Sequence, residues 1–397
     1  MTKQPVYLDY AAATPLDDEV LVAMLPYYQQ KFQNPSALYL SAKTVHGDVE
    51  SARETVAQVI GARPSEIVFT AGGTEANNLA ISGVMQQFPD GNVIASAIEH
   101  DSVLHPTALY QHRLTPVTAQ GIVDVDELIK LIDDNTVLVS VMYANNELGT
   151  IQPITKIAHE LQSIRQQRQA AGNSRPLYFH TDACQAANYL SLTKSRLGID
   201  LMTLNGGKIY GPKQSGCLFV RAGVELSPQI LGGGQERNLR SGTENVAGII
   251  GFARALQATQ QRRDTESARL GKLQKQFIQQ LRDRIPAVII TCLPQDSSDQ
   301  VEIPPVLPNF VHIRIPSADN ERLVMELDER DIQAAAGSAC SASNDEPSHV
   351  LTALGLSEAD AQSSIRFTMG RHTTEVDIER TVEALAAIDT VVYTDNR

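Results

Sequence analysis

Short apolar runs alternate with helix-prone segments between about residues 55 and 225. The apolar runs predict buried strands, and the amphipathic stretches between them, residues 75–87 and 154–170 for example, predict helices. Such alternation is typical of a mostly parallel sheet that is covered by helices on both faces. The predicted strands are residues 67–70, 93–97, 137–143, 177–181, 201–204 and 216–220.

The second half of the chain has a different pattern. Residues 245–284 are polar, charged and helix-prone, which predicts a helical arm that joins two domains. Residues 294–308 are rich in proline and predict a loop. Beyond them, strands such as residues 310–315 mix with helices such as residues 375–388. The pattern therefore predicts a large α/β domain followed by a smaller α+β domain.

Composition narrows the classes of function. With 397 residues, the chain is long enough for a large domain and a smaller one. Its formal net charge of -13 argues against direct nucleic-acid binding, which needs a basic surface. No apolar run approaches the roughly 20 residues of a membrane span, and no signal peptide is recognisable, so we expect a cytoplasmic protein. Four scattered cysteines without a Cys-x-x-Cys pair predict neither disulfides nor a metal site.

An aspartate and a lysine stand at the ends of two predicted strands. Asp182 follows the strand at residues 177–181, and Lys208 lies in the loop after the strand at residues 201–204. Both can meet at one edge of the sheet, where open α/β folds bind their ligands. The pair suits pyridoxal 5′-phosphate, because a lysine forms its Schiff base and a carboxylate keeps its pyridine nitrogen protonated. Each residue alone is also explained without a cofactor, Lys208 as a solvated loop residue and Asp182 as a helix cap.

A glycine turn between a predicted strand and a helix offers a phosphate site. Gly72, Gly73 and Thr74 follow the strand at residues 67–70 and lead into a helix, whose first amides attract phosphate. The same turn could simply cap the helix. His100 comes at the end of the next predicted strand, where an imidazole could stack on a cofactor ring and transfer protons.

One cysteine differs from the other three. Cys340 lies in a run of glycine, serine and alanine at residues 337–343, which neither buries a thiol nor holds it still. Such a segment suits a nucleophile that travels between sites. The other three, Cys184, Cys217 and Cys292, lie in or beside apolar strands or element ends, where a free cysteine behaves as a small hydrophobic residue.

Taken together, these motifs resemble the cysteine desulfurases of the iron-sulfur-cluster and nitrogenase type, within the class V, fold-type I pyridoxal-phosphate enzymes. The combination of motifs is specific, although each motif alone is not. The spacing from Cys340 to residues 346–351 resembles the branch with the longer catalytic loop, whose thiol can move out to an acceptor protein. The resemblance runs nearly end to end, through residues 7–15, 72–78, 145–149, 232–243 and 363–367.

This resemblance implies a role for each candidate residue. Lys208 resembles the Schiff-base lysine, and Asp182 resembles the partner of the pyridine nitrogen. His100 resembles the acid/base that stacks on the ring, and Cys340 the nucleophile that forms a persulfide. Gln185 resembles the hydrogen-bond donor to the ring hydroxyl, and Gly73, Thr74 and Asn205 resemble further cofactor-binding residues. Thr243 resembles a residue that the family supplies across the dimer interface. Asn146 and Arg366 resemble the pair that binds the substrate carboxylate.

The same resemblance implies the fold and the reaction. The fold is that of fold-type I enzymes, with a large domain at residues 16–255 around a mostly parallel seven-stranded sheet. Residues 1–15 and 256–397 form a smaller α+β domain that carries Cys340. The reaction takes sulfur from L-cysteine, gives L-alanine and leaves a persulfide on Cys340. An acceptor protein for iron-sulfur cluster assembly or tRNA thiolation then receives the sulfur, and the enzyme is expected to be a homodimer.

The chain departs from this family at three places. Asn205 and Gly207 stand where a serine and a histidine usually precede the lysine, so an imidazole contact to the phosphate is missing and weaker cofactor retention is expected. Tyr39 stands where a histidine is common. The chain stops at Arg397, without the extension through which some relatives hold their cluster scaffold.

Two other functions remain open at this point. A selenocysteine lyase would use the same residues on a selenium substrate. A catalytically quiet subunit that binds a partner is the second alternative, motivated by Asn205 and Gly207. No motif identifies the sulfur acceptor.

Overall fold

The larger part of the molecule is built around one seven-stranded sheet. The computed structural model describes residues 5–293, 305–337 and 347–395. The strand order is β2-β8-β7-β6-β5-β3-β4, in which β8 runs antiparallel to its two neighbours and the other pairs are parallel. This confirms the predicted α/β fold. The strands are β2 (Ile67–Thr70), β3 (Asn92–Ser96), β4 (His112–Thr115), β5 (Thr136–Ser140), β6 (Tyr178–Asp182), β7 (Leu201–Asn205) and β8 (Gly216–Val220).

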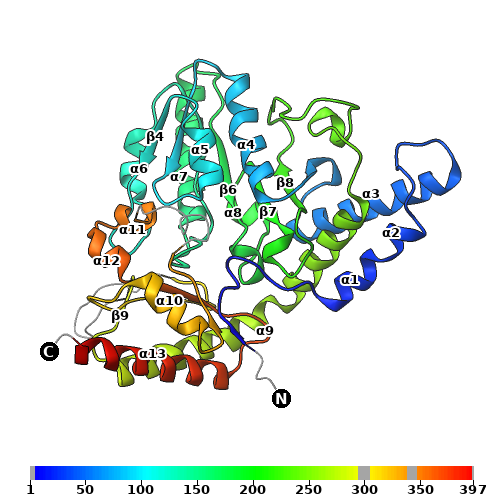
Figure 1. Ribbon diagram of the computed structural model, residues 1–397. Coiled ribbons are helices and arrows are strands. Elements are labelled where there is room, and N and C mark those ends of the chain that lie inside the picture. The colour runs from blue at the N-terminus through cyan, green and yellow to red at the C-terminus, as the bar shows by residue number, and fades with distance from the viewer. Residues whose placement is uncertain (1–4, 294–304, 338–346, 396–397) are drawn as a thin grey trace.

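Helices cover both faces of this sheet (Figure 1). Alternate residues of β2 point to opposite faces, so that Ile67 and Phe69 join one apolar core and Val68 joins the other. Because both faces are buried, the strands are apolar throughout rather than alternating. The helices of this part are α1 (Asp18–Met24), α2 (Pro26–Gln29), α3 (Leu40–Ile60), α4 (Gly73–Gln87), α5 (Asp101–Thr107), α6 (Val125–Leu131), α7 (Ile154–Ala170) and α8 (Lys194–Leu197).

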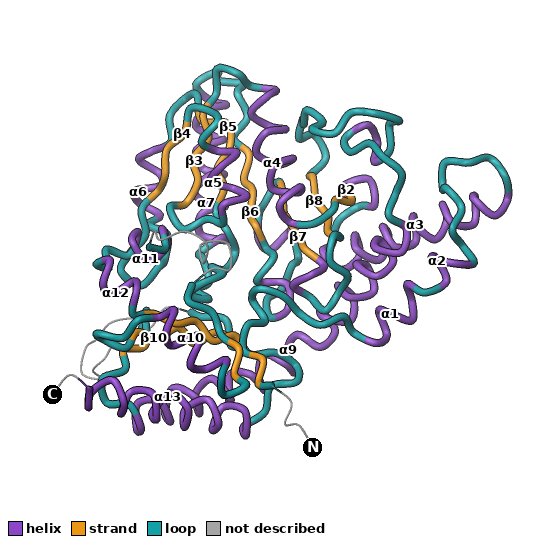
Figure 2. The backbone as a smooth tube through the Cα atoms, in the orientation of Figure 1, coloured by secondary structure: helices purple, strands orange, loops and turns teal. Residues whose placement is uncertain are grey.

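A second, smaller group of strands lies at the other end of the molecule, with α10 and α13 alongside it (Figure 2). Three strands form an antiparallel sheet in the order β12-β10-β9, and the N-terminal strand β1 pairs in parallel with β11. Its elements are β1 (Val6–Tyr7), β9 (Ile289–Ile290), β10 (Phe310–Arg314), α10 (Asn320–Asp328), β11 (Ile332–Gln333), α11 (His349–Ala353), α12 (Glu358–Gln362), β12 (Ser364–Thr368) and α13 (Glu375–Asp395).

One long helix, α9 (Val246–Arg284), joins the two sheets. Near its start Phe252 meets Phe69 of β2 edge to face, with ring centroids 6.4 Å apart. Near its end Phe277 meets Phe367 of β12 in the same way at 5.4 Å. The helix therefore packs on the large sheet with its first half and on the small sheet with its second half. The expected domain boundary after residue 255 falls within this helix.

Some elements differ from the sequence prediction. The strand β4 was not anticipated, because it is short and half polar and pairs only at the edge of the sheet, with β3. The 21-residue helix α3 was not anticipated either, although it buries apolar side chains at intervals of three and four residues. The last helix also reaches residue 395 rather than 388. Within the described ranges, no helix is both long and apolar enough to cross a membrane.

Candidate active site

Asp182 and Lys208 lie at the same edge of the large sheet. Asp182 is the last residue of β6 and is buried. Lys208 ends the 3₁₀ helix η3 (Gly206–Lys208), which directly follows β7. Since β6 and β7 are parallel neighbours, the turns that follow them emerge side by side. The carboxyl ends of parallel strands thus bring the two side chains into one region, the usual ligand site of an open α/β sheet.

A buried asparagine links Asp182 to His100. The amide of Asn77 in α4 donates to Asp182 Oδ2 at 2.7 Å and to Ser102 Oγ at 2.8 Å. The backbone N–H of Ser102 donates to His100 Nδ1 at 3.0 Å. Because a backbone amide can only donate, Nδ1 is the acceptor, and neutral His100 carries its proton on Nε2. Sequence reasoning missed Asn77, although it stands one helical turn after Gly73 on the face that α4 buries.

Glu99 is a second buried carboxyl beside this region. Its Oε1 accepts hydrogen bonds from Ser96 Oγ and from the backbone N–H of Met142, both at 2.6 Å, and its Oε2 has no partner in the described structure. Burial raises the pKa of Glu99 to about 8, and the negative charge of Asp182 adds to this shift. Glu99 is therefore protonated at neutral pH.

The amine of Lys208 is held against the N-terminal segment. Its Nζ donates to the carbonyl oxygens of Ala11 and Ala12, both at 2.7 Å. The side-chain amide of Gln185, in the turn after β6, donates to the same Ala11 oxygen at 3.0 Å. Burial lowers the pKa of Lys208, and the nearby charge of Arg366 acts in the same direction. A lowered pKa leaves more of the amine unprotonated, and the unprotonated amine is the form that reacts with an aldehyde.

A cavity of about 530 Å³ opens between Lys208 and the start of α4. The N-cap residue of this helix, Gly72, has no side chain that could cap it, and the first amides of a helix can bind an anion. At Gly73 a Cβ would come within 2.9 Å of Cys184 Sγ, so a larger residue does not fit there. These features fit the phosphate group of pyridoxal 5′-phosphate. The lining residues include Gly72, Gly73, Thr74, Asn205, Gly207, Lys208 and Lys213.

Arg366 and Asn146 meet on the side of the site that faces the small sheet. Arg366 in β12 is 2% exposed, and it donates to the carbonyl oxygen of Asn146 at 2.8 Å and to Asp9 Oδ1 at 2.7 Å. Its Nε and the Asn146 Oδ1 are buried without a hydrogen-bond partner in the described structure. The Nε–H of Arg366 is thus a spare donor for a bound anion, whereas the Asn146 oxygen can only accept. Asp9, which orients the guanidinium, was not singled out from the sequence.

One predicted site residue, Thr243, is not brought into this region. Thr243 lines a separate cavity of about 250 Å³ together with Thr70 and Arg240, and it is not among the residues around Lys208. Cys340 lies outside the described residues. The three described cysteines are poor nucleophiles, because burial raises the pKa of Cys184, of Cys217 and, to about 12, of Cys292.

The chain just after the Cys340 segment is anchored beside Glu99. His349 Nε2 lies 2.8 Å from the carbonyl oxygen of Glu99, and Ser348 Oγ donates to Glu147 Oε2 at 2.6 Å. Burial raises the pKa of Glu147. These contacts bring the start of α11 to the large sheet. Glu147 and Ser348 lie 201 positions apart, so local sequence patterns carried no signal for this contact.

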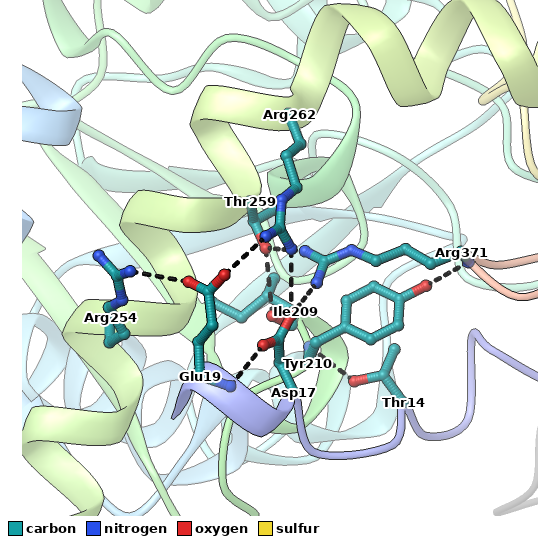
Figure 3. A network of polar contacts seen from close by, with 9 residues as sticks. All are labelled: Thr14, Asp17, Glu19, Ile209, Tyr210, Arg254, Thr259, Arg262 and Arg371. Atoms are coloured by element: carbon teal, nitrogen blue, oxygen red, sulfur yellow. Dashed lines mark hydrogen bonds and ion pairs between the residues drawn. The ribbon is translucent and has the colours of Figure 1, made fainter. Parts of the chain in front are cut away.

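A network of polar contacts clamps the loop that follows Lys208 (Figure 3). The backbone N–H of Tyr210 donates to Thr14 Oγ1 at 2.7 Å, and the phenol oxygen of Tyr210 accepts from the backbone N–H of Arg371 at 2.9 Å. The guanidinium of Arg371 lies 3.8 Å from the centroid of the Tyr210 ring and pairs with Asp17 at 2.7 Å. Arg262 of α9 reaches the same Asp17 oxygen at 3.1 Å. The N-terminal segment, α9 and the small sheet thus hold this loop jointly.

Among the residues that the structure describes, no group of three His, Cys, Asp or Glu side chains is placed to hold a metal ion.

Comparison with known proteins gives a consistent result. Residues 6–381 match the family model of class-V aminotransferases. The chain is 40% identical over 393 residues to the cysteine desulfurase IscS of Dictyoglomus turgidum. That alignment covers 97% of this chain and 95% of the relative. The superposition on a solved NifS-like protein covers 98% of this chain and 100% of the NifS-like chain, with 31% identity and a TM-score of 0.87. The superposition on the structure of SspA in complex with cysteine covers 93% of this chain and 100% of the SspA chain, with 33% identity and a TM-score of 0.76.

Proposed function

The chain belongs to the class-V aminotransferase family of pyridoxal 5′-phosphate enzymes, and we propose that it is a cysteine desulfurase, which converts L-cysteine to L-alanine and transfers the sulfur. The observation that carries this proposal is the meeting of Asp182 and Lys208 at one sheet edge, beside the cavity at the start of α4. The similarity to SspA, which was solved in complex with cysteine, supports the choice of substrate.

The residues of this chain would hold the cofactor at five points. Lys208 would attach to its aldehyde, Asp182 would pair with its pyridine nitrogen, and Gln185 would donate to its ring hydroxyl. Gly73, Thr74 and Asn205 would bind its phosphate, and His100 would lie against its ring. When bound, the cofactor withdraws electrons from the α-carbon of an attached amino acid and so weakens the bonds around that carbon.

Lys208 and His100 are the groups placed to move protons. The lowered pKa of Lys208 leaves more of its amine unprotonated, and the unprotonated amine can accept a proton. Neutral His100 holds its proton on Nε2, because Nδ1 accepts from the Ser102 amide. Arg366, with its unpartnered Nε, would bind the substrate carboxylate together with Asn146.

Cys340 is the proposed acceptor of the sulfur. Its thiolate would attack the sulfur of the bound cysteine, so that an S–S bond forms and the C–S bond breaks. The electron pair of the broken bond stays on the carbon, which takes up a proton and becomes the methyl group of alanine. The raised pKa values of Cys184, Cys217 and Cys292 support this assignment, since these thiols stay protonated.

A homodimer is also proposed, with Thr243 supplied to the partner's site. Exposed apolar side chains near the N-terminus and after β8 support it, since Leu38 is 88% exposed and Leu40 and Leu231 are each 81% exposed. An acceptor protein for cluster assembly or tRNA thiolation, and a cytoplasmic location, remain predictions.

The test is to incubate the purified protein with pyridoxal 5′-phosphate and then with L-cysteine or L-selenocysteine, and to measure alanine release from each. We expect alanine from cysteine and a persulfide on Cys340 by mass spectrometry. The control variant Cys340→Ser should bind the cofactor normally but form almost no alanine and no persulfide. Protein that stays colourless with added cofactor would support the quiet subunit, and faster release from selenocysteine would support the lyase.

A further inference from the structure

Lys213 is a cation at the cofactor cavity to which no role has been assigned. It lies in the loop between η3 and β8 and lines the same cavity as Gly73 and Thr74. Its Nζ donates to the carbonyl oxygen of Thr14 at 2.6 Å. Across the described parts of the chain, no carboxylate forms an ion pair with it. An ammonium group has three protons, so contact with Thr14 leaves Lys213 able to donate to a further acceptor.

The other charged groups around this cavity are already committed. Lys208 is the lysine to which the cofactor would attach. Glu75, the carboxylate on the lining, pairs with Arg240 at 2.8 Å and accepts from the backbone N–H of Ala71 at 2.9 Å. The helix start supplies a partial positive charge of roughly half a unit, which is less than a phosphate dianion requires. Lys213 is therefore the lining residue with an uncommitted full positive charge.

The space beside Lys213 is open because residue 207 is glycine. A Cβ built at Gly207 would lie 3.7 Å from Lys213 Cγ and 3.4 Å from Asn205 Oδ1. No side chain at this position stands between the lysine stem and Asn205, which also lines the cavity. The stem of Lys213 therefore passes beside Gly207 in the lining of the cavity.

We propose that Lys213 binds the phosphate group of the cofactor and replaces a side-chain donor at position 207. This inference rests on the proposed function, because the ligand is the cofactor of that reaction. A charge-assisted hydrogen bond from an ammonium group to a phosphate oxygen is about twice as strong as a neutral one. Lys213 would keep its bond to Thr14 at the same time, which ties the N-terminal segment to the bound cofactor.

The test compares cofactors with and without the phosphate. Lys213→Met keeps the length of the side chain and removes its charge, and Lys272→Met is the matched control, since Lys272 is exposed on α9. Calorimetry measures the affinity of each protein, freed of cofactor, for pyridoxal 5′-phosphate and for pyridoxal. We expect Lys213→Met to lose roughly 10- to 100-fold in affinity for the phosphorylated form and less than about twofold for pyridoxal, because one charge-assisted bond is lost.

The outcomes separate the two proposals. If Lys213→Met keeps its affinity for pyridoxal 5′-phosphate, or loses both affinities equally, Lys213 does not bind the phosphate. An equal loss would mean that the contact with Thr14 only holds the site together. If the wild-type protein and Lys272→Met bind neither compound, the proposed function itself fails, whatever Lys213 does.

Discussion

Replacing Glu99 with glutamine should change the pH dependence of stability. Glu99 is fully buried, and its Oε1 accepts two hydrogen bonds that a glutamine Oε1 can also accept. Glutamine cannot ionise, so Glu99→Gln removes the titration and keeps these contacts. The folded protein holds a proton on Glu99 up to a pH of about 8, whereas the unfolded chain releases it near 4.5.

The sign and size of the effect follow from this difference in pKa. Between pH 4.5 and about 8 the folded state binds one more proton than the unfolded state, so this group lowers the free energy of unfolding as the pH rises. The slope is about 1.4 kcal/mol per pH unit, and the total over this range is about 5 kcal/mol. The stabilising effect is complete below pH 4.5 and is lost once the pH passes the folded-state pKa.

The assay is urea unfolding from pH 5 to 9 at one protein concentration and saturating cofactor, followed by circular dichroism. We expect the free energy of unfolding of Glu99→Gln, minus that of the wild type, to rise with pH and level off above pH 8. Glu66→Gln is the control. Although burial alone would raise it, the ion pair with Lys194 and two backbone amides hold the pKa of Glu66 below its ordinary value. The free energy of unfolding of Glu66→Gln should be lower than that of the wild type by an amount that does not change between pH 5 and 9. A flat difference for Glu99→Gln as well would refute the reasoning.

Two further predictions concern the site. Lys208→Ala should form no alanine and should show no lysine adduct after borohydride reduction with added cofactor. Peptide mass spectrometry detects such an adduct, and an adduct on another lysine would show that the assignment is wrong. Asn77→Ala should lower the free energy of unfolding by about 2 to 4 kcal/mol, because buried Asp182 loses a charge-assisted donor and Ser102 loses a neutral one. Denaturant unfolding measures this, and the neighbouring Asn78→Ala, whose amide bonds only within its own helix turn, should cost less than about 1 kcal/mol; equal losses in the two variants would contradict the role of Asn77.

Local patterns predicted much of the large sheet. The six strands expected from apolar runs all occur, with ends shifted by no more than three residues, because a strand buried on both faces must be apolar along its length. The strand β4 was not predicted, because it is stabilised by pairing with β3 rather than by an apolar pattern of its own. The positions of Asp182 and Lys208 at strand ends were accessible in the same local way.

The rest of the site depends on contacts between distant segments. Arg366 and Asp9 lie 357 positions apart, and Lys208 and Ala11 lie 197 positions apart. No periodicity or motif spacing carries such pairings, since they arise only when β1, β12 and the turn after β7 pack together. The raised pKa of Glu99 and the lowered pKa of Lys208 are of the same kind, because each reflects burial by many elements at once.

Local sequence patterns were therefore enough to predict the fold class, the sheet edge of the candidate site, and residue types suited to a pyridoxal-phosphate enzyme. These follow from short-range rules, in which a side chain's neighbours in the chain set its environment. The tertiary structure alone decided that Asn77 connects Asp182 to His100, that Asp9 orients Arg366, and that Lys213 lines the cavity. Hydrogen bonds and charge interactions act over a few ångströms in space, and only the folded chain sets those distances.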